Sequence, residues 1–169
     1  FVFPFRKESL KMLDWAVSHH SSWKAQYLMG LNLMGRAQMK RGIKIFKDLR
    51  QNPDDHLFYF IRGMLFKAQK LPKYQNDLNY AYQQSPKNWR YAFSLAEDHF
   101  KSGNTSVALK IIQKTFKEDN NNYFAGMLLA QILNHIEDYD KTIELLKNLK
   151  ILPYEHATEG RKIYTDAYV

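Results

Sequence analysis

The chain has 169 residues and a mass of 20.1 kDa, and 45% of its residues are hydrophobic. That composition excludes a disordered chain, and no apolar run approaches the roughly 18 residues of a transmembrane helix, so no membrane span is expected. Cysteine is absent, which excludes disulfides and thiolate metal sites. The net charge of +8 lies mostly in residues 1–50, which hold ten Lys or Arg against three Asp or Glu.

Hydrophobic periodicity and helix-breaking residues predict an all-α chain of about ten helices. In chain order they cover residues 6–19, 22–35 with 37–51, 54–69 with 72–84, 87–101 with 104–117, 121–136 with 139–150, and 154–167. The pair at 87–117 has the clearest turn, because Gly103 tolerates a left-handed conformation there. Thr105 or Ser106 is expected to cap the helix that follows.

These pairs repeat with a fixed period. A small residue in the first helix of each pair recurs at steps of 33, 33 and 34, with a large and mostly aromatic residue seven positions earlier and a proline or aspartate twenty-three positions later. The small residues are Gly30, Gly63, Ala96 and Ala130; the earlier residues are Trp23, His56, Trp89 and Tyr123; the later ones are Pro53, Pro86, Asp119 and Pro153. A period near 34 over four copies predicts an array of helical hairpins.

The second helices carry matching columns, because two antiparallel helices approach closely only where small side chains meet. The small column is Gly42, Ala108 and Thr142, and the large apolar column is Phe46, Ile112 and Leu146. In the second pair these columns would hold Gln75 and Asn79. Sliding that pair back by one residue gives Tyr74 and Leu78 at these two positions, and brings Ala81 into the same alignment. A one-residue difference is therefore expected at the turn around Leu71 and Pro72.

The same spacing describes both ends of the chain. Residues 6–19 read as the second helix of a truncated repeat, whose inner face with Leu10, Leu13 and Val17 is expected to be exposed. We therefore expect FVFPFR to fold back over that face, or copies of the chain to associate end to end. Residues 154–167 are expected to lie over the other end, and no linker interrupts residues 1–169, which read as one domain.

On these columns the chain resembles the tetratricopeptide repeat family. The resemblance implies a right-handed superhelix of antiparallel hairpins whose first helices line a concave groove. The chain departs from the family pattern where Trp23 and Trp89 lie seven rather than four residues before the small position, and where Arg62 replaces the usual leucine.

A second, narrower resemblance rests on three short strings, Phe3–Arg6, Asp14–Val17 and Trp23–Lys24. They are similar to the C-terminal tetratricopeptide region of a family of large bacterial proteins of unassigned function. In that family a β-rich domain of carbohydrate-enzyme type precedes the repeats. The resemblance implies an excised interaction tail and leaves the compartment open between bacterial cytoplasm and periplasm.

The predicted binding face is the side of each first helix that points away from its partner helix. It mixes aromatic residues, methionines and a few cations, which suits an extended peptide or an amphipathic helix of another protein. Its residues are Lys24, Tyr27, Leu31 and Met34; Leu57, Phe60, Met64 and Lys67; Arg90, Phe93, Glu97 and Lys101; and Phe124, Met127, Gln131 and Asn134. The alternative for each apolar member is ordinary packing between adjacent hairpins.

Protein or peptide binding without catalysis is the leading functional prediction. No metal site is expected at His19 and His20, because neither has a ligand partner at helical spacing. No catalytic residue or cofactor site is expected either, since consecutive residues such as Glu97 and Asp98 diverge on a helix and phosphate-loop and nucleophile motifs are absent.

Two other functional classes stay open. One is an accessory domain of a carbohydrate-active enzyme whose catalytic domain lies upstream. The other is a polyanion-binding module that uses the face shared by Arg36, Lys40, Lys44 and Lys47, although a solvated helix face gives the same pattern. Nucleic acid is the less favoured polyanion, because no pair of base-reading positions recurs in the repeats.

Overall fold

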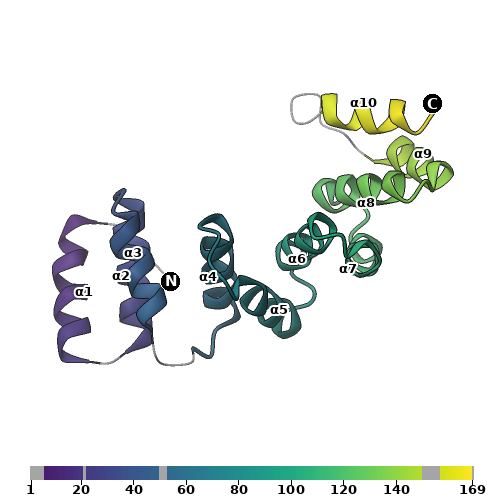
Figure 1. Cartoon of the computed structure of the whole chain (residues 1–169). Helices are drawn as coiled ribbons and strands as arrows, with labels where there is room; N and C mark the ends of the chain where they lie inside the picture. The colour runs from purple at the N-terminus through teal and green to yellow at the C-terminus, as the bar shows by residue number, and fades with distance from the viewer. Residues whose placement is uncertain (1–5, 21, 50–52, 150–156, 169) are drawn as a thin grey trace. The chain divides into compact units, whose positions relative to one another are not determined.

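The computed structural model describes residues 6–20, 22–49, 53–149 and 157–168, which form ten α-helices (Figure 1). In chain order these are α1 (Lys7–His19), α2 (Trp23–Gly35), α3 (Met39–Asp48), α4 (His56–Ala68), α5 (Tyr74–Gln84), α6 (Trp89–Lys101), α7 (Thr105–Glu118), α8 (Tyr123–His135), α9 (Tyr139–Asn148) and α10 (Ala157–Asp166). The prediction of an all-α chain of antiparallel helix pairs is confirmed.

The helices group into two compact units, residues 1–77 and 78–169, and the division falls inside α5. Unit 1 contains α1 to α4 and the first turn of α5. Unit 2 contains the rest of α5 and α6 to α10. Each unit has its own buried clusters of apolar side chains, and each is described by itself below.

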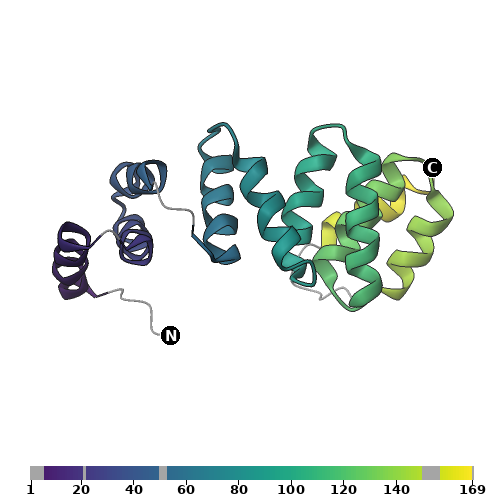
Figure 2. The same ribbon diagram turned by 90° about the horizontal axis from the view of Figure 1, so that it is seen from below.

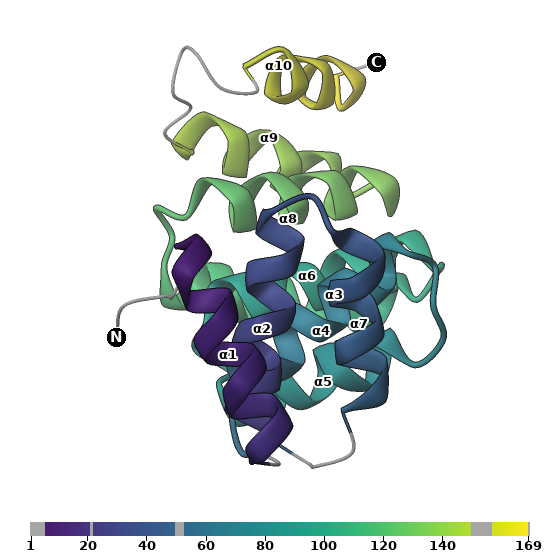
Figure 3. The ribbon, with the colours of Figure 1, turned by 90° about the vertical axis from the view of Figure 1, so that its left-hand side faces the viewer.

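In unit 1, α2 packs between α1 and α3 (Figure 3). Leu13 of α1 is buried in one cluster with Met29 and Leu33 of α2, and Leu10 and Val17 pack against that cluster. The expectation of an exposed inner face at residues 6–19 was therefore wrong, because this face covers the helix that follows. The exposed apolar residues of α1 are Met12 and Trp15 on its other side. The predicted folding back of FVFPFR concerns residues 1–5, which lie outside the described residues.

A second cluster in unit 1 is built from aromatic rings. Phe46 of α3 and Phe58 of α4 stack with ring centroids 5.7 Å apart, and Tyr27 of α2 meets both rings edge-on at 5.8 and 5.4 Å. The α4–α5 hairpin is joined by a bidentate ion pair, in which the Arg62 guanidinium donates at 2.7 Å to each carboxylate oxygen of Asp77. The arginine that departs from the family pattern thus links the two helices of its hairpin.

In unit 2, α7 packs between α6 and α8, and α8 also packs on α9 and α10 (Figure 2). One buried cluster includes Ala96, Ala108 and Ile112 together with five apolar residues of α8, among them Ala125. A second cluster joins α8 and α9 to Ile163 of α10. The terminal helix therefore covers α8 and α9.

Small residues set the distance between the helices of a hairpin. A Cβ added at Gly42 of α3 would lie 2.8 Å from the carbonyl oxygen of Gly30 in α2, and one added at Gly30 would lie 2.7 Å from the Phe46 ring. The corresponding residues of the α6–α7 hairpin, Ala96 and Ala108, are fully buried in one cluster. This agrees with the predicted small columns.

The four hairpins close with the same helix-ending hydrogen bonds. A residue with positive φ follows each first helix by two positions, at Ala37 (φ 59), Lys70 (φ 53), Gly103 (φ 81) and Glu137 (φ 64). The amide after it donates to a carbonyl five residues earlier, as from Gln38 to Leu33 at 2.9 Å and from Asn104 to His99 at 2.8 Å. This is the Schellman motif.

The turn between α4 and α5 is longer than the others. It contains a second left-handed residue, Lys73 (φ 68), just after Pro72. Leu78 and Ala81 are the buried apolar residues of α5, with 1% and 0% of their surface exposed, whereas Asn79 is only half-buried. The one-residue difference in register predicted for this hairpin is therefore present.

The first helices of the hairpins start at a column of polar residues. Asp55 accepts a hydrogen bond from the Leu57 amide at 2.7 Å, Asn88 accepts one from Arg90, and Asn122 accepts one from Ala125. These side chains satisfy amides that the first helical turn leaves without partners. The prediction that Thr105 or Ser106 caps α7 was wrong, because the residue before α7 is Asn104 and it makes no side-chain capping bond.

The close approach of α2 and α3 predicts opposite effects for two glycines of unit 1. Gly42→Ala should lower the free energy of unfolding by about 1–3 kcal/mol, because the new methyl group meets the carbonyl oxygen of Gly30 as well as the Met34 side chain, and the backbone oxygen cannot move aside as a side chain can. Gly35→Ala at the end of α2 is the matched control, since a Cβ there meets nothing within 4 Å, and it should leave stability unchanged or raise it by up to about 1 kcal/mol. Urea unfolding followed by circular dichroism measures both, and equal effects would contradict the steric account.

The left-handed turn residues predict a second pair of opposite effects. Ala37→Gly should stabilise the chain by about 0.5–1 kcal/mol, because alanine is strained at positive φ and glycine is not. Gly103→Ala should destabilise it by about 1 kcal/mol for the same reason, although nothing lies within 4 Å of the new Cβ. Thermal unfolding of the two variants tests this, and a stabilised Gly103→Ala would overturn the assignment.

Candidate functional site: a groove on the first helices of unit 2

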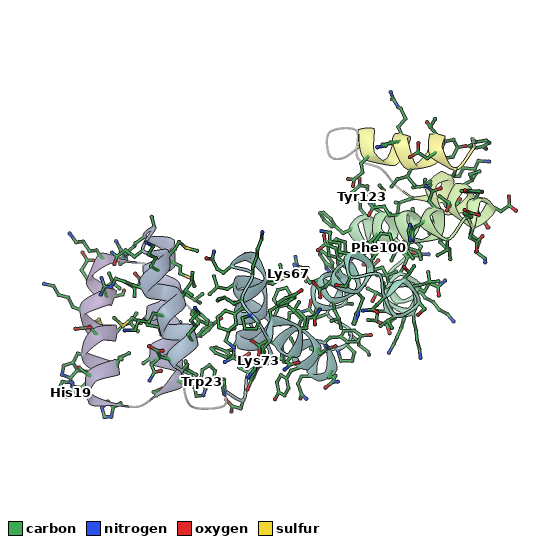
Figure 4. The ribbon with its side chains drawn as sticks, in the orientation of Figure 1. His19, Trp23, Lys67, Lys73, Phe100 and Tyr123 are labelled. Carbon is green, nitrogen blue, oxygen red and sulfur yellow. The ribbon has the colours of Figure 1, made fainter. Side chains whose placement is uncertain are left out.

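A groove of about 460 Å³ opens in unit 2 between α6, α8 and the start of α10. Phe93, Glu97, Phe100 and Lys101 of α6 line one side, Tyr123, Phe124, Met127, Leu128 and Gln131 of α8 line the other, and Glu159 of α10 completes the set. Figure 4 labels Phe100 and Tyr123, which come from neighbouring helices. The volume of the groove is in the usual range for sites that take a small ligand or a few residues of a peptide.

The groove contains a group of aromatic rings centred on Phe124. The Phe124 ring stacks on Trp89 at 5.5 Å with an angle of 6° between the planes, and it meets Phe93 and Tyr123 at 6.3 and 5.7 Å. Phe124 remains 43% exposed despite these contacts. Its neighbours hold the ring in place while one side stays open to solvent, as expected of an anchor for an apolar side chain.

Charged and polar groups form the rest of the lining. Lys101 and Glu97, one turn apart on α6, make an ion pair of 2.6 Å. Across the groove, the side-chain amide of Gln131 on α8 donates to the Glu159 carboxylate on α10 at 2.8 Å. Carboxylates therefore belong to the lining on two different helices, and the one lysine among the lining residues is next to one of them.

Six of the eight residues predicted for the binding face of unit 2 line this groove. They are Phe93, Glu97, Lys101, Phe124, Met127 and Gln131. The other two do not: the Arg90 guanidinium lies 4.6 Å from the centre of the Trp89 ring, and the Asn134 side-chain oxygen is buried without a hydrogen-bond partner in the described structure.

Sequence reasoning missed four lining residues, Phe100, Tyr123, Leu128 and Glu159. Tyr123 was assigned only to the recurrent aromatic column. Glu159 belongs to the predicted helix at residues 154–167, which was expected only to lie over the end of the array. Spacing gave a usable signal for Phe100, since it lies seven residues after Phe93, which is two helical turns.

The predicted binding residues of unit 1 do not all stay on the surface. Tyr27, Leu31 and Met34 pack against the cluster of Phe46, Leu49 and Phe58, as the packing alternative for apolar members stated. Of the other five, three are exposed and two are half-buried. Leu57 and Met64 are 44% and 39% exposed, Lys24 is exposed, and Phe60 and Lys67 are half-buried.

The described residues hold no group of three or more His, Asp or Glu side chains that could bind a metal ion. Glu97 and Asp98 diverge, because Glu97 lines the groove whereas Asp98 is buried with 3% of its surface exposed. None of the described helices is long and apolar enough to cross a membrane.

Three solved structures share this arrangement of helices. YrrB, described as a tetratricopeptide protein with an unusual peptide-binding site, is 17% identical, with a TM-score of 0.72 over 96% of this chain and 81% of its own. A tetratricopeptide protein from Parabacteroides merdae is 15% identical, with a TM-score of 0.73 over 95% of this chain and 64% of its own. The chain has the tetratricopeptide-repeat fold. MamA from Desulfovibrio magneticus RS-1 is 16% identical, with a TM-score of 0.67 over 94% of this chain and 85% of its own.

Sequence comparison adds one match to this tetratricopeptide fold. A family model described as subunit 3 of the anaphase-promoting complex, or cyclosome, matches residues 77–149, which include α6 to α9 and most of α5. No curated protein matches the chain. Tetratricopeptide arrays are in general non-catalytic modules that bind proteins or peptides.

Proposed function

We propose that this chain is a non-catalytic scaffold that binds a protein or peptide in the groove of unit 2. The observation that carries the proposal is Phe124, an aromatic ring fixed by its neighbours yet 43% exposed inside a largely apolar groove. Exposed aromatic anchors surrounded by polar groups are common at the centres of protein interfaces. The peptide-binding site of YrrB, a tetratricopeptide protein of the same fold, also supports it.

The exposed residues of unit 1 form a second proposed binding face, which is considered by itself. Leu57 and Met64 occupy the positions of α4 that correspond to Phe124 and Gln131 in α8. Their exposure of 44% and 39% supports a role in contacting a partner. Lys24, Phe60 and Lys67 belong to this proposed face of unit 1, whereas the partly buried Tyr27, Leu31 and Met34 pack against the cluster of Phe46, Leu49 and Phe58.

The anchor role of Phe124 is tested with peptides of about twelve residues selected on the whole chain from a random displayed library. Phe124→Ala should weaken binding of the selected peptides at least about tenfold, as removal of a central aromatic contact does at other interfaces. Val107→Ala is the matched control, because Val107 of α7 is also 43% exposed and lies outside the groove. Fluorescence anisotropy measures the affinities, and equal losses in the two variants would refute the proposal.

The parent context is a further proposal. The resemblance of Phe3–Arg6, Asp14–Val17 and Trp23–Lys24 to a bacterial family supports a role as the interaction tail of a larger protein. In the alternative, the array serves as an accessory domain of a carbohydrate-active enzyme. The sequence that precedes Phe1 in the gene distinguishes them, because a β-rich domain with clustered acids favours the accessory role.

Polyanion binding by unit 1 is the second candidate, favoured by an uneven charge distribution. Unit 1 holds fourteen Lys or Arg against six Asp or Glu, which accounts for the net charge of +8, whereas unit 2 holds eleven of each. Lys40, Lys44 and Lys47 are exposed along α3, and none of them is ion-paired with a carboxylate among the described residues.

A salt titration tests this second candidate with a single-stranded oligonucleotide of about twenty nucleotides as the probe. If three lysines contact phosphates, the logarithm of the binding constant should fall with the logarithm of salt concentration with a slope of about −2. Replacing Lys40, Lys44 and Lys47 together by glutamine should remove most of that slope. A slope near zero for the unmodified chain would eliminate the candidate.

A further inference from the structure

The groove of unit 2 has an acidic and aromatic character that narrows the class of partner. Its lining contains two carboxylates, Glu97 on α6 and Glu159 on α10, and one cation, Lys101. That cation is already ion-paired with Glu97 at 2.6 Å. The lining thus carries a net negative charge, although the chain as a whole is strongly positive.

Each carboxylate is able to accept more hydrogen bonds than its named partner supplies. A carboxylate has two oxygens with about four lone-pair directions between them. Lys101 bonds to one oxygen of Glu97, and Gln131 bonds to one oxygen of Glu159. An arginine side chain would therefore share these carboxylates with the partners that they already have.

The aromatic rings beside these carboxylates favour a planar cation. A guanidinium group stacks on aromatic faces and at the same time presents its N–H groups sideways to carboxylates. The exposed ring of Phe124 and the ring of Phe93 supply such faces inside the groove. An ammonium group lacks the flat shape, so lysine satisfies the same surroundings less well.

The chain already holds one of its own arginines in this way. In unit 1 the Arg62 guanidinium lies 5.0 Å from the centre of the Phe58 ring and 5.2 Å from that of Tyr59, while it donates two hydrogen bonds to Asp77 from the next helix. The groove of unit 2 offers the same kinds of groups, aromatic rings on one helix and a carboxylate on a neighbouring one, with no arginine among its lining residues.

We propose that the groove of unit 2 binds a peptide segment through an arginine side chain, which stacks on Phe124 and donates to Glu97 and Glu159. An apolar residue beside the arginine fills the space lined by Phe100, Met127 and other apolar side chains. This inference rests on the proposed peptide-binding function and adds the chemistry of the partner.

The closing experiment uses peptides selected on the whole chain from the random library. Arginine should be enriched in them, and replacing that arginine by citrulline, which keeps the shape but removes the charge, should weaken binding at least about tenfold. Replacing it by lysine should weaken binding severalfold, and binding of the arginine peptide should fall as salt increases.

Variants of the groove separate this inference from a general loss of structure. Glu97→Gln and Glu159→Gln should each reduce the difference between the arginine and citrulline peptides, whereas Glu144→Gln on α9, outside this groove, should leave it intact. Lys101→Gln should strengthen binding of the arginine peptide severalfold, because a competing cation is removed from Glu97. A structural role for Lys101 predicts weaker binding instead, and that result would contradict the proposal.

Failure of this inference is distinguishable from failure of the proposed function. Selected peptides that depend on Phe124 but bind equally well with arginine or citrulline would overturn the arginine site and leave peptide binding in place. Selection of no peptide whose binding depends on Phe124 would overturn both. Arginine enrichment that persists in Glu97→Gln and Glu159→Gln would assign the arginine to some other surface and also refute the proposal.

Discussion

The arrangement of each hairpin depends on how closely its two helices approach. At Gly30 and Gly42 the backbones are so near that an added methyl group meets a carbonyl oxygen or a ring. Ala96 and Ala108 in one hairpin and Ala130 and Thr142 in another are fully buried at the same repeat positions. Because the paired helices are held together on this side, the opposite side of each first helix is left for other contacts. In unit 2 that side carries the groove.

The fold was predictable because its determinants are local and repeated. Each hairpin combines a small residue, a large apolar residue and a helix stop at fixed spacing, and the positions of Leu78 and Ala81 even revealed where one turn differs. A column of helix caps, Asp55, Asn88 and Asn122, is a further signal that the repeat contains. The exposure of α1 was predicted wrongly, because spacing does not say which side of a helix its next neighbour covers.

The candidate site was predictable only in part, because side-chain packing between hairpins decides which residues stay accessible. Tyr27 has the position in α2 that Met127 has in α8, yet it packs against the rings of Phe46 and Phe58. Glu159 was missed because its place in the groove depends on how α10 packs on α8, a contact between residues far apart in sequence. Periodicity identifies which residues share a helix face, whereas packing by neighbouring side chains determines which of them stay accessible to a partner.

The division of the chain inside α5 has a consequence for its dynamics. Asp77 belongs to unit 1 and is held by Arg62, whereas the next residue, Leu78, belongs to unit 2 and is buried. Since helix formation is cooperative, the two ends of α5 do not melt independently. The stability of α5 therefore depends both on the ion pair of Asp77 with Arg62 and on the burial of Leu78, and losing either one weakens the whole helix.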